Sequence, residues 1–169
     1  MFNILAKNAK NMQRMFGWLT TIIDELSKAN SCDLGANEMR RIIEFLKNSS
    51  AIGIQKMKDA LDKKCPAEGS TDAEIENFKI EYEKDLVKRF LCYQDKNKNN
   101  VLMILAKHIR DGALREMLKN DNTVEHITHD LLAIRNDLNQ TLASIIEVNR
   151  EDMPESLALV LKAEYACHA

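Results

Sequence analysis

The chain has 169 residues, a length typical of one domain, of which 45% are apolar and 30% charged. This composition is that of a globular protein and excludes a disordered chain. The formal net charge of −2 excludes nucleic-acid binding driven by bulk positive charge. Only five glycines and two prolines are present, which argues against all-β folds and glycine-rich phosphate-binding loops.

The first segment is predicted to be an amphipathic helix. Apolar residues recur at steps of three and four, from Phe2 through Phe16 to Ile23, and so share one helix face. Burial of this face in the core is the first interpretation. The alternative is a peripheral membrane helix over residues 1–23. The segment has no acidic residue, and it offers a basic face (Lys7, Lys10 and Arg14) and apolar anchors (Phe2, Phe16 and Trp18).

Further helices follow along the middle of the chain. Asn37 is predicted to cap a second helix, and a third is expected to begin at Ser50 and to end before Pro66. Residues 66–71 form the clearest linker. We therefore expect a single helical domain over 1–169, with a subdivision at this linker into residues 1–65 and 72–169. Thr71 opens a fourth helix that continues to Tyr93.

The C-terminal half predicts short and long helices without strands. A polar loop over residues 95–100 precedes a short buried helix over 101–106, and a second short helix covers 113–118. Residues 123–148 carry apolar residues at steps of three and four and predict one long helix, which could also serve as a homodimer seam. Asp152 is expected to cap the last helix. The predicted fold class is all-α, a bundle of about eight helices.

Residues 101–118 resemble the two-helix core of an ankyrin-type repeat. The first-helix pattern L-x-L-A is matched by Met103, Leu105 and Ala106, and the paired apolar residues of the second helix by 113–114 and 117–118. The family's Thr-Pro start is replaced by Val-Leu at 101–102, and Ile109 occupies the slot of the glycine in the turn. The resemblance implies one or two helical hairpins, and it implies protein recognition of the kind seen in effector proteins of intracellular bacteria.

The resemblance also indicates where a protein partner would bind. The expected surface is the polar loop and the exposed side of the hairpin: Lys96, Lys98, Asn99, Asn100, Lys107, His108, Arg110 and Asp111. The function expected is that of a non-enzymatic interaction module, an effector or adaptor, located in the cytoplasm or delivered into that of a host. No cofactor and no nucleic-acid partner are expected.

One cluster suggests metal chemistry as a further alternative. His126 and His129 are three residues apart and would share one face of the predicted long helix, next to Glu125 and Asp130. A catalytic zinc site needs a third ligand, and the H-E-x-x-H pattern is absent. A metal-dependent helical enzyme centred on His126 and His129 is therefore the second alternative, and two solvated histidines are the simpler interpretation.

Overall fold

The computed structural model describes the backbone of residues 2–28, 34–48 and 86–168 and the side chains of residues 13–28, 34–48 and 86–166. These residues form helices, turns and loops without a strand, so the all-α prediction is confirmed for them. The predicted third helix, the linker at 66–71 and the cap at Thr71 lie outside the described residues. Within the described ranges, no helix is long and apolar enough to cross a membrane.

The N-terminal helix α1 (Phe2–Lys28) contributes its predicted face to the core. Phe16, Leu19 and Ile23 are buried in one cluster with Phe90, from the helical residues 86–92. The rings of Phe16 and Phe90 lie 5.9 Å apart, which is within the range of favourable aromatic pairs. Aromatic packing thus joins the start of the chain to a segment more than 70 residues later.

Residues 36–48 form the next described helix. The helix begins one residue before the predicted cap at Asn37, because the Gly35 carbonyl accepts a hydrogen bond from the Met39 amide and the Gly35 amide donates to the Glu38 carboxylate. Met39, Ile43 and Leu46 recur at steps of three and four and are all buried in the core. Periodicity therefore predicted the buried face of this helix correctly.

The first helical hairpin consists of α4 (Val101–Lys107) and α5 (Asp111–Lys119). The Asn100 side chain caps α4 by accepting a hydrogen bond from the Met103 amide. All six residues from Val101 to Ala106 are buried, which matches the short buried helix expected there. Asp111 and Gly112 belong to α5, so the turn between the two helices lies at residues 108–110 and not at 111–112.

The predicted long helix over residues 123–148 is wrong. The segment contains a short 3₁₀ helix η1 (Val124–His126), α6 (His129–Leu132), a loop and α7 (Leu142–Val148). Threonine and asparagine side chains bond to nearby backbone groups and so compete with a continuous helix. Thr128 and Thr141 each cap a new helix in this way. The proposed homodimer seam therefore has no continuous helix on which to lie.

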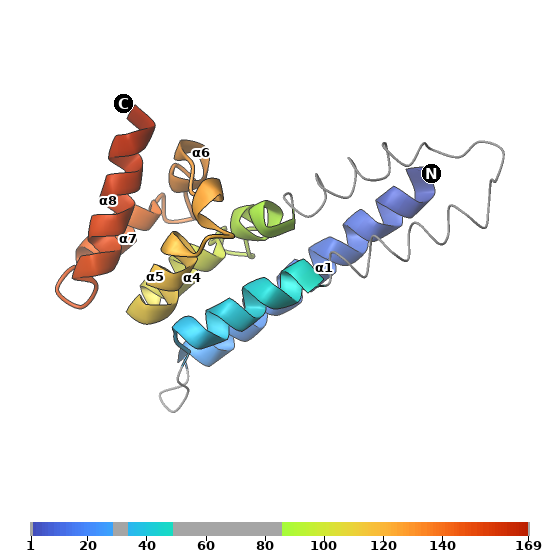
Figure 1. Cartoon of the computed structure of the whole chain (residues 1–169), viewed down its shortest axis with the longest axis horizontal. Helices are drawn as coiled ribbons and strands as arrows, with labels where there is room; N and C mark the ends of the chain where they lie inside the picture. Colours follow the sequence, from blue (N-terminus) through green and yellow to red (C-terminus); the bar gives the residue numbers. More distant parts are fainter. Residues whose placement is uncertain (1, 29–33, 49–85, 169) are drawn as a thin grey trace.

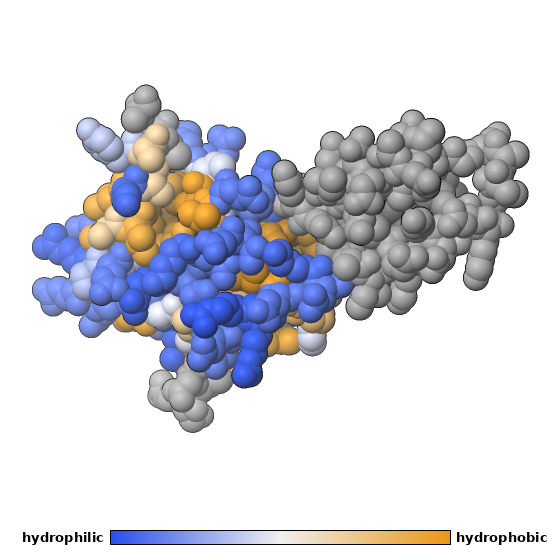
Figure 2. All heavy atoms as spheres, in the orientation of Figure 1, coloured by the Kyte–Doolittle hydropathy of each residue, from blue (hydrophilic) through white to orange (hydrophobic). Residues whose placement is uncertain are grey.

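The last helix, α8 (Pro154–His168), packs with α7 as a second hairpin. It begins two residues after Asp152, which lies in the preceding turn and does not cap it. The first helices of the two hairpins, α4 and α7, pack against each other, and so do the second helices, α5 and α8 (Figure 1). Helix α1 packs against α4. Polar residues cover most of the face in Figure 2, with apolar residues at the surface near α6 and α8.

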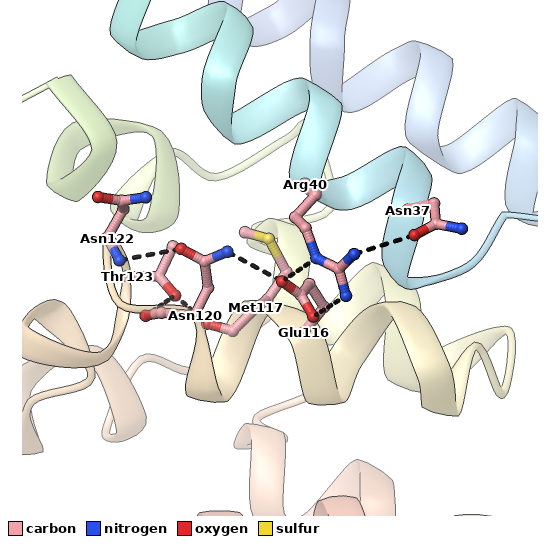
Figure 3. A network of polar contacts seen from close by, with 7 residues as sticks. All are labelled: Asn37, Arg40, Glu116, Met117, Asn120, Asn122 and Thr123. Atoms are coloured by element: carbon pink, nitrogen blue, oxygen red, sulfur yellow. Dashed lines mark hydrogen bonds and ion pairs between the residues drawn. The ribbon is translucent and has the colours of Figure 1, made fainter.

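A polar network ties residues 36–48 to the first hairpin (Figure 3). The Arg40 guanidinium donates to both carboxylate oxygens of the buried Glu116 on α5, at 2.9 and 3.3 Å. The Asn120 amide donates to the same carboxylate at 2.9 Å. Hydrogen bonding from Arg40 holds the pKa of Glu116 below its usual value, against the opposing effect of burial. The ionised carboxylate is therefore part of the folded structure.

Candidate functional site

A groove of about 540 Å³ separates α1 from the end of α4 and from the polar loop over residues 95–99, called the first loop below. Residues 17–28 of α1 supply one wall, and Tyr93, the loop over residues 95–99 and the end of α4 supply the other. The volume falls within the range of ligand-binding clefts. Four of the predicted partner-binding residues, Lys96, Asn99, Lys107 and His108, line this groove together. The sequence did not reveal α1 as the opposite wall.

The first loop is closed by its own hydrogen bonds. One carboxylate oxygen of Asp95 accepts from the amides of Asn97 and Asn99, each at 2.9 Å, and the Asp95 amide donates to the Asn99 carbonyl. Lys98 takes a left-handed backbone conformation, with φ of 59°. The loop thereby turns sharply and leaves Lys96 and Lys98 exposed.

The same loop occurs a second time, 41 residues further along the chain. Asn136 takes the place of Asp95: its side-chain oxygen accepts from the amides of Leu138 and Gln140. Asn139 takes the place of Lys98, with φ of 60°. Thr141 then caps α7 as Asn100 caps α4. The described part of the chain therefore contains two loop–helix–helix units, over residues 95–119 and 136–168.

The two loops are joined to each other. The Asp137 amide donates to the Asn97 carbonyl at 3.0 Å, and the Asn136 side chain donates to the Asn99 side-chain oxygen at 2.9 Å. The side-chain amide of Gln94, just before the first loop, donates to the Arg135 carbonyl, just before the second loop. Because the helices of the two units also pack pairwise, the units form a stack whose loops lie on one side.

This stacking corrects the expectation for Asn99 and Asn100. Both are buried, Asn99 in the bond to Asn136 and Asn100 in the cap of α4. Their side chains hold the loop in place and do not offer a free contact surface. The sequence carries a signal for both units: a short polar loop, then a capping residue and an apolar run.

His108 connects the end of α4 to α1 across the groove. Its Nε2 lies 3.1 Å from a carboxylate oxygen of Asp24, and the Lys28 ammonium lies 2.8 Å from the other oxygen. Burial raises the pKa of Asp24, but hydrogen bonds from Lys28 and His108 outweigh this effect and leave that pKa below its usual value. Asp24 is therefore an ionised link between the two walls.

Arg110 and Asp111 make structural contacts. The Arg110 guanidinium donates twice to the Ser27 carbonyl near the end of α1, at 3.2 and 2.9 Å. Asp111 pairs with Arg115 at 2.9 Å and accepts from the buried Ser156 hydroxyl on α8. Arg110 thus fastens α1, and Asp111 fastens the second unit. Neither residue lines the groove.

The two histidines of the metal alternative lie on separate elements. His126 ends η1 and His129 begins α6, with residues 127–128 outside any helix between them. The common helix face that the spacing predicted is therefore absent. Nowhere in the described part of the chain do three histidine, cysteine or acidic side chains gather as metal ligands. No observation here favours the metal alternative over protein binding.

The membrane alternative loses one of its expected anchors. Phe16 is fully buried against the core, so it is not available to a lipid surface. Trp18 on the same helix is 59% exposed and remains accessible. The side chains of Phe2, Lys7 and Lys10 lie outside the described residues. The described part of α1 behaves as a core helix.

No family model, curated protein or solved structure matches this chain.

Proposed function

We propose that the chain is a non-enzymatic protein-binding module whose partner occupies the groove between α1 and the first loop. The observation that carries the proposal is the bond between the Asp137 amide and the Asn97 carbonyl. It fixes the first loop against the second, so that Lys96 and Lys98 are presented from a rigid surface. Binding groups held in place before association lose less conformational entropy when a partner arrives.

The second loop–helix–helix unit supports extending the ankyrin-type resemblance to residues 136–160. Stacked repeats of this kind form continuous surfaces suited to protein recognition. A role as an effector or adaptor, in the cytoplasm or in a host cytoplasm, belongs to the same proposal and rests on that resemblance alone.

A quantitative pull-down with the intact chain tests the proposal. The wild-type protein, the variant K96E/K98E and the control K88E/K162E serve as baits against a lysate of the source organism and a eukaryotic lysate. Lys88 and Lys162 are exposed and lie away from the groove, so the control makes the same charge change elsewhere. We expect one saturable partner that K96E/K98E no longer captures and K88E/K162E still captures.

Folding of each variant is checked by circular dichroism, because all four lysines are exposed and their reversal should leave the fold intact. A partner that K96E/K98E retains with full occupancy would show that the loop is not the binding surface. Absence of any saturable partner in both lysates would contradict the function itself.

A further inference from the structure

We propose that the ligand of this groove is an extended, acidic peptide segment. The inference rests on the proposed function and specifies the chemistry of the partner. It follows from which charged groups of the groove already have partners within the protein and which do not.

The carboxylates that line the groove are all engaged internally. Asp95 accepts two backbone amides of its own loop. Asp24 is paired with Lys28 at 2.8 Å and with His108 at 3.1 Å, and Glu25 lies 3.6 Å from the same Lys28 ammonium. Each of these carboxylates already has a partner within the protein, which weakens its attraction for a basic ligand.

Two ammonium groups of the groove are not engaged. Lys96 on the loop and Lys107 at the end of α4 are exposed, and neither forms a hydrogen bond or an ion pair with any described residue. Lys98 adds a third exposed ammonium on the same loop. Four lysines (Lys28, Lys96, Lys107 and the neighbouring Lys98) face three carboxylates, so the formal charge of this surface is +1, although the chain as a whole carries a net charge of −2. A ligand bearing carboxylates complements it.

Hydrogen-bonding groups beside these lysines fit a peptide. The Asn97 side chain is exposed on the groove and can both donate to and accept from a peptide backbone. The hydroxyl of the exposed Thr21 donates to the Gly17 carbonyl and retains lone pairs that can accept a peptide N–H. These side chains can hydrogen-bond to a peptide backbone, and the lysines beside them can pair with acidic side chains of the same peptide.

A nucleic acid fits this surface less well. Its affinity depends on neutralising many phosphates, on the order of six to ten in well-studied complexes, and this groove offers two free lysines with a third nearby. The carboxylates of Asp24, Glu25 and Asp95 lie in the same groove and would repel a continuous polyanion. Spaced carboxylates on a peptide can contact the lysines and avoid these acids.

Selection from a random peptide library tests the inference without presupposing a sequence. Octapeptides displayed on phage are selected against the immobilised full chain, and the Asp and Glu content of the enriched peptides is compared with that of the input library. K96E/K107E and the control K88E/K162E are selected in parallel. We expect acidic enrichment on the wild type and on the control, and none on K96E/K107E.

The most enriched peptide is then measured by fluorescence anisotropy beside a version with glutamine and asparagine in place of its acids. Loss of two ion pairs should weaken binding about tenfold, and added salt should weaken the acidic peptide more than the neutral one. K96E/K107E should show a similar loss, and K88E/K162E should bind within about twofold of the wild type.

The inference fails if no peptide is enriched, if the enriched peptides show no acidic excess, or if the excess persists on K96E/K107E. These outcomes are separate from failure of the proposed function. A lysate partner that depends on Lys96 and Lys98, found together with peptides that lack acidic excess, would retain the binding module and reject the acidic ligand.

Discussion

The side chain of Asn136 donates to the side-chain oxygen of Asn99, 37 residues earlier in the sequence, at 2.9 Å, and this buried contact joins the two loops. Asn136 also accepts from the amides of Leu138 and Gln140 and donates to the Gln140 side chain. One amide side chain therefore shapes its own loop and fixes the loop before it.

Replacing Asn136 with alanine should destabilise the protein by about 2 kcal/mol, because the Asn99 oxygen and two backbone amides lose a partner together. Urea unfolding measures the change. D137A is the matched control, since Asp137 contributes its backbone amide and not its exposed side chain to the loop contact. It should change stability by less than about 0.5 kcal/mol. Equal effects of N136A and D137A would contradict this role of Asn136.

Ile109 has a backbone φ of 56°, a left-handed conformation that β-branched residues rarely adopt. Its strain should amount to about 1–3 kcal/mol, and glycine removes it. Because the Ile109 side chain is exposed, little packing is lost. We therefore expect I109G to raise the free energy of unfolding by about 1 kcal/mol, measured in urea.

The same substitution at Lys107, in the last turn of α4, is the control for I109G. Glycine within a helix costs about 0.5–1 kcal/mol, so K107G should destabilise the protein. If I109G destabilises the protein as much as K107G does, the left-handed conformation of Ile109 is not strained.

The Glu116 carboxylate should make stability depend on pH. Its pKa is lower in the folded state than in the unfolded chain, so the ionised form stabilises the fold. This contribution is complete above the ordinary pKa of 4.5 and is lost as the pH falls through the lower folded-state value. E116Q should therefore be less stable than the wild type at pH 7, by about 1–3 kcal/mol, and the difference should shrink as the pH falls below 4.5.

Urea unfolding at pH 7 and at stepwise lower pH measures the effect of E116Q. The control is E155Q, which removes an exposed carboxylate that pairs with Arg115. A surface pair of this kind contributes about 0–1 kcal/mol, so E155Q should have a smaller effect. A difference between E116Q and wild type that stays constant over the whole pH range would exclude a contribution from the ionised carboxylate.

Phe16 and Trp18 on α1 should respond differently to alanine substitution. Phe16 is fully buried, and F16A should cost about 3–5 kcal/mol of stability. Trp18 is 59% exposed, and W18A should cost distinctly less. Thermal unfolding compares the two variants. Flotation with anionic liposomes at low salt, lost in W18A alone, would instead favour the membrane alternative for this helix.

Local periodicity determined the parts of the fold in which each helix buries one face of its own. The buried residues of α1, of residues 36–48 and of α4 follow from apolar residues at steps of three and four or from a short apolar run, because a helix places such residues together whatever its partner is. The lysines at 96 and 98 could also be assigned to the surface, since they lie in a polar loop.

Tertiary structure decided what periodicity could not. The apolar spacing over residues 123–148 fits one helix, yet Leu138 within it is 72% exposed in a loop. Several short helices that each bury a few residues produce nearly the same apolar spacing in the sequence as one long helix. The loop between these short helices depends on the contact of Asn136 with Asn99. The groove likewise has one wall from α1 and another more than 60 residues away. Its free charges depend on pairings such as Asp24 with His108, which form only when distant segments pack together.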